Sequence, residues 1–129
     1  KDPRAKVCAL VIDPNGLQIL STGYNGIPRK VHENPERWNR ENDEKYYWVE
    51  HAERNAIYNA SGRGVSLNGS VLICNKFPCA DCARAIIQCG IHEVYTRPID
   101  PKNKKWAKSW KCAQIMLLEA GVRVFFKQV

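Results

Sequence analysis

Residues 70–90 read SVLICNKFPCADCARAIIQCG and join a strand pattern directly to a helix pattern. The apolar run at 70–76 predicts a buried strand. Pro78 stands at the start of a helix, where proline is well tolerated, and Gly90 follows the last residue of the helix predicted for 79–89. A strand followed at once by a helix favours a βαβ unit, whose strands pair in parallel through a right-handed crossover.

The rest of the chain extends this unit to a mixed α/β sheet. Strand patterns at 6–13 and 17–22 flank the turn Asp13-Pro14-Asn15-Gly16 and predict a hairpin. The other predicted elements are a helix at 51–60, a strand at 94–96, a helix at 104–120 and a strand at 122–126. The order is therefore β-β-α-β-α-β-α-β, with an antiparallel hairpin and parallel pairing in the second half.

Two further segments have the composition of loops. Gly23-Tyr24-Asn25-Gly26 and the following Pro28 interrupt the second strand pattern. The polar excursion 29–45 contains Pro35 and predicts a surface segment with a short helical turn. An excursion of that length in a compact domain is usually functional or mobile.

Length and charge limit the class of protein. The chain has 129 residues, which fits a single domain, and a formal net charge of +7. A basic balance favours nucleic acid, acidic lipid or a phosphorylated small molecule as partner, although it also serves solubility alone. The sequence has no apolar run long enough to cross a bilayer and no signal peptide, so we expect a cytoplasmic protein, in the host cytoplasm if the source is viral.

The chain opens at Lys1-Asp2-Pro3-Arg4, without a methionine and almost directly before the first strand pattern. We expect a native N-terminal segment, a helix, to precede it. Without that helix, one face of the sheet would be partly uncovered.

The six cysteines favour metal or redox chemistry over a disulfide framework. Only Cys79 and Cys82 are closely paired in the sequence. We expect the remaining four to be small buried apolar residues: Cys8, Cys74, Cys89 and Cys112.

Two short motifs carry the chemistry, and each is predicted at the start of a helix. They are His51-Ala52-Glu53 and Pro78-Cys79-Ala80-Asp81-Cys82. One imidazole and two thiolates suit Zn²⁺ and leave a fourth tetrahedral position free, as in a catalytic site, whereas a structural site would need a second pair of ligands. Taken separately, His51 could be a buried core histidine, Glu53 a partner of the helix dipole, and the cysteines a thioredoxin-like redox pair.

Glu53 lies two residues after His51, where its carboxylate could exchange protons with a water at the metal without binding the metal. The combination H-x-E followed by P-C-x-x-C is the signature of the zinc nucleobase deaminases. Each half is weak alone, but the two together, in this order and on successive βα units, are specific.

The sequence resembles the deoxycytidylate (dCMP) deaminase family of the cytidine deaminase superfamily. The matching stretches are Asp2–Arg4, Lys6-Val7, Ser21–Pro28, His51–Ile57, Phe77–Ala83 and Ala120–Val122. The resemblance implies a cytidine deaminase-like three-layer α/β/α sandwich with a mixed five-stranded sheet, assembled as a hexamer.

The resemblance also implies residue roles. His51, Cys79 and Cys82 would hold one catalytic zinc per chain, and Glu53 would be the proton shuttle. The substrate-binding residues would be Asn25, Ala52, Phe77 and Pro78.

The implied reaction is hydrolytic removal of the amino group of dCMP, which gives dUMP and ammonia. Water activated at the zinc attacks C4 of the cytosine while Glu53 protonates N3 and then the leaving amino group. Gly23, Tyr24, Asn25 and Gly26 would contribute to a regulatory site, where dCTP with Mg²⁺ activates and dTTP inhibits.

The chain departs from its relatives in the excursion and at Cys8, which stands where relatives usually have glycine. Some of them carry a second, structural zinc, but the excursion offers only His32 and no cysteine as ligands, so we expect a single zinc. The 5′-phosphate ligands are not identified by the motifs. Arg97 is a candidate, although a solvated arginine at a strand end fits it better.

Other functions remain open at this stage. Related deaminases act on free cytosine, cytidine or tRNA adenosine, and a zinc-stabilised module without catalysis is a further alternative. Basic and aromatic residues at 104–111 could grip a polynucleotide. An amphipathic helix fits them better, with Trp106 and Trp110 against the sheet and Lys104, Lys108 and Lys111 facing solvent.

Overall fold

The computed structural model describes residues 5–129. Its sheet has five strands in the order β2-β1-β3-β4-β5, and the predicted mixed α/β architecture is confirmed. The strands are β1 (Cys8–Ile12), β2 (Ile19–Tyr24), β3 (Val71–Cys74), β4 (Glu93–Thr96) and β5 (Arg123–Phe126). Strand β1 pairs antiparallel with both β2 and β3, whereas β3, β4 and β5 are parallel, as expected for a hairpin followed by two βαβ units.

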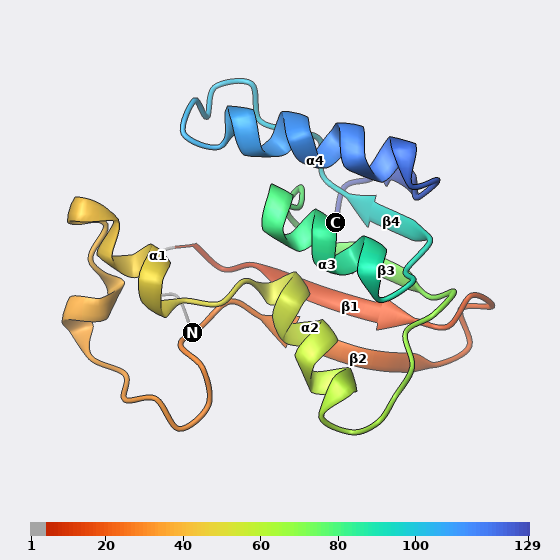
Figure 1. Ribbon diagram of the computed structural model, residues 1–129, viewed down its shortest axis with the longest axis horizontal. Coiled ribbons are helices and arrows are strands. Elements are labelled where there is room, and N and C mark those ends of the chain that lie inside the picture. Colours follow the sequence, from red (N-terminus) through yellow and green to blue (C-terminus); the bar gives the residue numbers. More distant parts are fainter. Residues whose placement is uncertain (1–4) are drawn as a thin grey trace.

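Three helices follow the order that the sequence predicts. They are α2 (Ala52–Ser61), α3 (Ala80–Gln88) and α4 (Ala107–Glu119). All three lie on the same face of the sheet (Figure 1). The connections from β2 to β3, from β3 to β4 and from β4 to β5 each join parallel strands and advance in the same direction across the sheet, so right-handed crossovers place their helices on one side. The core fills the space between this helical layer and the sheet, with Val11, Leu72 and Val94 of the sheet fully buried.

The other face of the sheet has no helix over it within residues 5–129. Its side chains are only partly buried: Leu10, Ile12, Ile73, Tyr95 and Phe125. Tyr95 and Phe125 stack on this face with ring centroids 4.8 Å apart. The described residues thus form one helical layer on a mixed sheet.

Several sequence expectations need correction. Strand β2 continues through Gly23 and Tyr24, which were expected in a loop, because Gly23 packs against α2 in extended conformation. Cys8 is exposed, since it lies on the open face of the sheet, and only Cys74 of the four expected buried cysteines is fully buried. All six cysteines are free.

The excursion 29–45 is more structured than expected. It contains two 3₁₀ turns, η1 (Pro35–Trp38) and η2 (Glu41–Asp43), and leads into the short helix α1 (Glu44–Trp48). Asn34 caps η1 by accepting a hydrogen bond from the Glu36 amide. Lys45 at its end is buried, so the excursion packs onto the body of the protein instead of projecting into solvent.

None of the helices in residues 5–129 is both long enough and apolar enough to cross a lipid bilayer.

Helix α2 lies unusually close to β2, and this contact positions the first functional motif. Ala52, Ala56 and Ala60, four residues apart, form the buried side of α2. A Cβ at Gly23 would overlap the carbonyl oxygen of Ala52 and the amide nitrogen of Ala56. Only small residues on both sides permit this approach.

Hydrogen bonds fix the register of α2 on β2. The side-chain amides of Asn55 and Asn59 donate to the main-chain oxygens of Tyr24 and Thr22, at 2.8 and 2.7 Å. The buried Ser21 hydroxyl donates to the oxygen of Ala56 at 2.6 Å. Together these bonds hold the start of α2 in a defined place relative to the sheet.

We predict that Gly23→Ala destabilises the fold by about 1–3 kcal/mol or more, because the added methyl group meets backbone atoms that cannot move aside. Denaturant unfolding measures the effect. The matched control is Thr22→Ser on the exposed side of the same strand, which should change the unfolding free energy by less than about 0.5 kcal/mol. Equal stability of the two variants would contradict the close packing.

Candidate active site

Two helix N-termini meet at the candidate site. His51 is the N-cap residue of α2 and Cys79 the N-cap residue of α3, both with extended backbone. The Nδ1 atom of His51 lies 3.4 Å from Sγ of Cys79 and 3.4 Å from Sγ of Cys82. The three ligand atoms all lie within 4.8 Å of one another. The structure thus brings together the three predicted metal ligands.

This arrangement fits zinc. Bond lengths of about 2.0–2.1 Å to nitrogen and about 2.3 Å to sulfur place tetrahedral N and S ligands roughly 3.6 Å apart. The observed 3.4 Å separations are close to this value. Both sulfur atoms belong to the first turn of α3, whose N-terminal dipole favours thiolates.

The pKa values of the two cysteine thiols also bear on how a cation would bind. A hydrogen bond from Cys82 and, less strongly, one from His51 lower the pKa of Cys79 to about 4, despite burial. The adjacent Cys79 and burial raise the pKa of Cys82. A cation that binds all three ligands therefore displaces a proton from Cys82.

Glu53 is buried beside the three ligands and only 4% exposed. Burial raises the pKa of its carboxyl, against the opposing effects of its own backbone hydrogen bond and of His51. A carboxyl with a raised pKa can both take up and release a proton near neutral pH, as a proton shuttle must.

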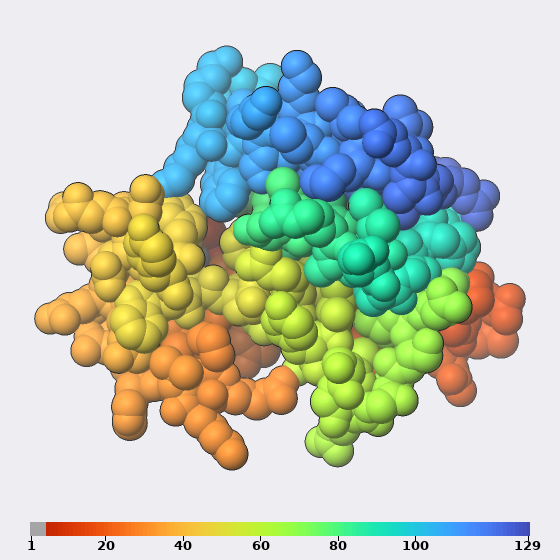
Figure 2. Space-filling view, viewed as in Figure 1, coloured from red at the N-terminus to blue at the C-terminus, as the bar shows by residue number. Residues whose placement is uncertain are grey.

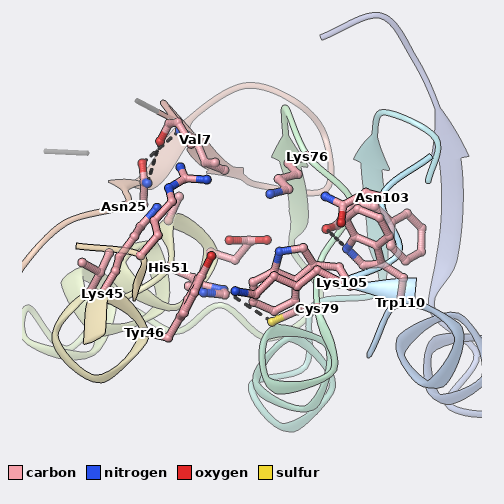
Figure 3. Close-up of a pocket in the computed structure, with 17 residues that line it drawn as sticks. Val7, Asn25, Lys45, Tyr46, His51, Lys76, Cys79, Asn103, Lys105 and Trp110 are labelled. Carbon is pink, nitrogen blue, oxygen red and sulfur yellow. Dashed lines mark hydrogen bonds between the residues drawn. The ribbon is translucent and has the colours of Figure 1, made fainter. Parts of the chain in front are cut away.

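A cavity of about 290 Å³ opens onto this cluster. His51, Glu53 and Cys79 are among the residues that line it, and Figure 3 shows His51 and Cys79 close together. The excursion and the segment before α4 line its sides, and the space-filling view shows these two segments meeting on one side of the molecule (Figure 2). Lys105 Nζ of the latter segment lies 3.1 Å from Asp43 Oδ1 of the excursion, an exposed ion pair between the two segments.

Two hydrogen bonds join helix α4 to the residues around the cysteine motif. The Trp110 indole donates to the main-chain oxygen of Phe77 at 3.1 Å, and the Ser109 hydroxyl accepts from the Ala80 amide at 2.8 Å. The second bond satisfies one of the free N–H groups at the start of α3.

Trp106 was predicted to pack against the sheet, but it lines the cavity instead. Its ring stands edge-on to His51, with centroids 5.9 Å apart, and to Tyr46, at 5.7 Å. The reason is that α4 begins at Ala107, so Trp106 precedes the helix and turns toward the site. Trp110 is buried in the core as predicted.

The cavity is strongly basic. Among residues 5–129, one acidic side chain, Glu53, and four cationic side chains line it; the cations are Arg40, Lys45, Lys76 and Lys105. The side chain of Lys76 points into the cavity (Figure 3), and its Nζ lies 5.8 and 6.0 Å from the ring centroids of Trp106 and Trp110. Sequence patterns did not single out any of these four residues.

Arg97 is not part of this cavity. Its Nε donates to the main-chain oxygen of Val129 at 2.6 Å, and its side chain is exposed. This placement matches the alternative of a solvated arginine at a strand end.

The other predicted substrate residues fall into two groups. Asn25, Ala52 and Phe77 line the cavity, whereas Pro78 is fully buried outside the lining. The Asn25 side chain accepts from the Val7 amide at 2.9 Å and donates to the Ala5 oxygen at 2.7 Å, so it ties the start of β1 to the cavity wall.

The residues predicted to form a regulatory site do not share one surface. Gly23 is buried against α2, Tyr24 is 60% exposed, and Gly26 forms an isolated bridge with Glu50. Asn25 is the member of the group that lines the cavity. The Asp2–Arg4 stretch that also carries the resemblance lies outside the described residues.

Comparison with known proteins identifies the family. Residues 1–97 match the cytidine and deoxycytidylate deaminase zinc-binding region. The chain belongs to this deaminase family. Within the family, the chain is 41% identical over 98 residues to human deoxycytidylate deaminase and 38% identical over 103 residues to a probable deoxycytidylate deaminase of Drosophila melanogaster. Each match covers 73% of this chain, which spans about half of each relative, 53% and 49%.

A solved structure of the family is also similar. The dCMP deaminase of cyanophage S-TIM5, in complex with dCMP and dUMP, superposes with a TM-score of 0.77 at 33% sequence identity. The match covers 96% of this chain and 82% of the phage protein. The cytidine deaminase-like fold and the zinc-binding region of this family member are thereby established.

We predict that zinc affinity falls as the pH is lowered from about 8 to about 5, because protons compete with the metal for its ligands. The hydrogen bond with Cys79 raises the pKa of His51 in the metal-free protein, so protonation opposes zinc at a higher pH than for an ordinary histidine. Competition with a chromophoric chelator at several pH values measures this, and the affinity should drop up to ~10-fold per pH unit for each proton displaced. An affinity independent of pH would contradict the ligand assignment.

Proposed function

We propose that this chain catalyses the zinc-dependent hydrolytic deamination of dCMP to dUMP and ammonia. The observation that carries the proposal is the convergence of His51, Cys79 and Cys82 beside the buried carboxyl of Glu53 at a basic cavity. Three protein ligands leave one coordination position for the reaction, as catalytic zinc sites do. Zinc held there would lower the pKa of a coordinated water and so supply a nucleophile at neutral pH.

The residues of the chain would then handle the substrate and its protons. The planar cytosine would enter the cavity with C4 toward the metal ligands, and Phe77 and Trp106 offer apolar walls. The Glu53 carboxyl would take one proton from the attacking water and deliver it to N3 of the ring. It would then take the remaining proton from the new C4 hydroxyl group and deliver it to the amino group, so that the C4–N bond breaks, ammonia leaves and the C4 carbonyl of the product forms. Its burial suits this alternation, because burial raises the pKa of the carboxyl and so favours its protonated form.

The charge of the cavity favours a nucleotide over a nucleoside or a free base. Cytosine and cytidine carry no phosphate with which the four cationic side chains of the lining could interact. A 5′-phosphate supplies a dianion for which lysine and arginine are common ligands. The size of the cavity, about 290 Å³, suits one nucleotide.

A direct assay tests the substrate. The zinc-loaded protein is incubated with dCMP, deoxycytidine, dCTP, cytosine and tRNA, and ammonia release is followed. We expect dCMP to have the highest kcat/KM. Reaction with tRNA alone would overturn the substrate assignment, and reaction with none would overturn the enzymatic one.

The remaining expectations from the family resemblance stay predictions. They are activation by dCTP with Mg²⁺, inhibition by dTTP, a hexameric assembly, and a location in the cytoplasm. The same assay with and without the two effectors tests the regulatory part, and light scattering tests the assembly.

We predict that Glu53→Gln lowers kcat by about 10²–10⁴-fold, because the amide cannot take up the proton. The zinc content should remain near that of the parent protein, since Glu53 is not one of the three ligands. Glu119→Gln at the exposed end of α4 is the matched control and should leave kcat unaltered. A catalytic rate near the parent value in the Glu53 variant would be incompatible with the proposed role.

We predict that Lys76→Met and Lys105→Met each reduce the ratio of kcat/KM for dCMP to that for deoxycytidine by about 10-fold or more, as loss of one charged hydrogen bond would. The control is Lys108→Met on the exposed face of α4, outside the cavity lining. Steady-state kinetics with both substrates gives the ratio. If both cavity variants kept the parent ratio, the phosphate would not be bound at this wall.

A further inference from the structure

Arg54 lies on the first turn of α2 but does not line the cavity. Its side chain is only 18% exposed. Its Nε donates to Glu50 Oε1 at 2.6 Å, and its Nη2 contacts the same carboxylate oxygen. A guanidinium with two contacts to one carboxylate is held more rigidly than an exposed surface arginine.

The Glu50 carboxylate connects this pair to the metal ligand. Its Oε1 also accepts a hydrogen bond from the main-chain amide of His51 at 2.8 Å. The backbone of Glu50 is fixed in turn by reciprocal hydrogen bonds with Gly26, at 2.9 and 3.0 Å. Arg54 and Glu50 therefore hold the backbone of the residue that supplies the imidazole.

The other edge of the guanidinium reaches the cysteine motif. Nη1 of Arg54 lies 3.5 Å from Oδ2 of Asp81, which stands between Cys79 and Cys82 on the first turn of α3. The remaining oxygen of Asp81 pairs with Arg84 within α3. Arg54 is thus a bridge from the His51 motif to the cysteine motif.

The charge of Arg54 also suits its place beside the sulfur atoms. Burial lowers the pKa of its guanidinium, but the hydrogen bond to Glu50 and the nearby Cys82 and Cys79 raise it, and the net direction is upward. A cation next to two sulfur ligands stabilises the thiolate forms that bind zinc.

We infer that Arg54 is a positioning residue for the zinc site. Through Glu50 and Asp81 it holds the first turns of α2 and α3 in a fixed relative position, and it thereby sets the affinity of the site for zinc. The interaction is distinct from the proton shuttle at Glu53, because Arg54 is outside the cavity lining. It concerns the metal site alone and does not depend on which base is deaminated.

The test measures zinc affinity in the absence of any substrate, so its outcome is independent of the proposed reaction. We expect Arg54→Met, which keeps the length but not the charge, to weaken zinc binding about 10–100-fold in competition with a chromophoric chelator. Arg84→Met is the matched control, because Arg84 pairs with the same Asp81 from its own helix. It should change the affinity by less than about threefold.

Two further measurements separate positioning from general stabilisation. The thermal midpoint of the metal-free Arg54→Met protein should stay close to that of the Arg84→Met protein, while the increase in midpoint on adding zinc becomes smaller. Arg54→Lys, which retains the charge, should recover part of the zinc affinity. Should Arg54→Met fail to fold, Arg54→Lys carries the test alone, and its zinc affinity should then lie about 3- to 100-fold below the parent value.

A double-mutant cycle checks the bridge itself. Combining Arg54→Lys with Asp81→Asn should weaken zinc binding less than the two single effects multiplied, because both changes break one contact. Parent-like zinc affinity in the Arg54 variants, or fully independent effects of the two changes, would overturn the inference.

Discussion

The metal site exists because two helices begin side by side. Each ligand motif occupies the first turn of its helix, so the position of each ligand depends on where the sheet and loops place that helix start. Helix α2 is held by its close approach to Gly23, and α3 by the hydrogen bond between the Ala80 amide and the Ser109 hydroxyl of α4. Both helix dipoles direct their positive ends at the ligands, which favours the thiolates that a cation requires.

The charges around the site divide into two regions with different tasks. Close to the metal ligands, burial raises the pKa of the Glu53 carboxyl. Arg54, outside the cavity lining, pairs with the carboxylates of Glu50 and Asp81. Elsewhere, lysines and an arginine line the cavity, and Glu53 is the one acidic residue in the part of the lining that the structure describes. In the proposed reaction, this arrangement would separate proton transfer from phosphate recognition along one cavity.

The features that the sequence predicted well are local ones, because each of them depends on residues that are close together in the chain. The order of strands and helices, the helix starts at His51 and Cys79, and the ligand set follow from short patterns with a known physical basis. The cavity walls were not predictable in this way. Lys45 and Lys105 are far apart in the chain, and only the folding of the excursion against the segment before α4 brings them to one cavity. Gly23 was misread for the same reason, since its packing against α2 has no local signal.

X-ray absorption spectroscopy of the zinc-loaded protein tests the central claim most directly, because it reports the identity and distances of the atoms bound to the metal. We expect two sulfur ligands at about 2.3 Å, one imidazole nitrogen, and one light atom that does not come from the protein. A coordination shell with four protein ligands, or one without sulfur, would contradict the assignment of an open site held by His51, Cys79 and Cys82.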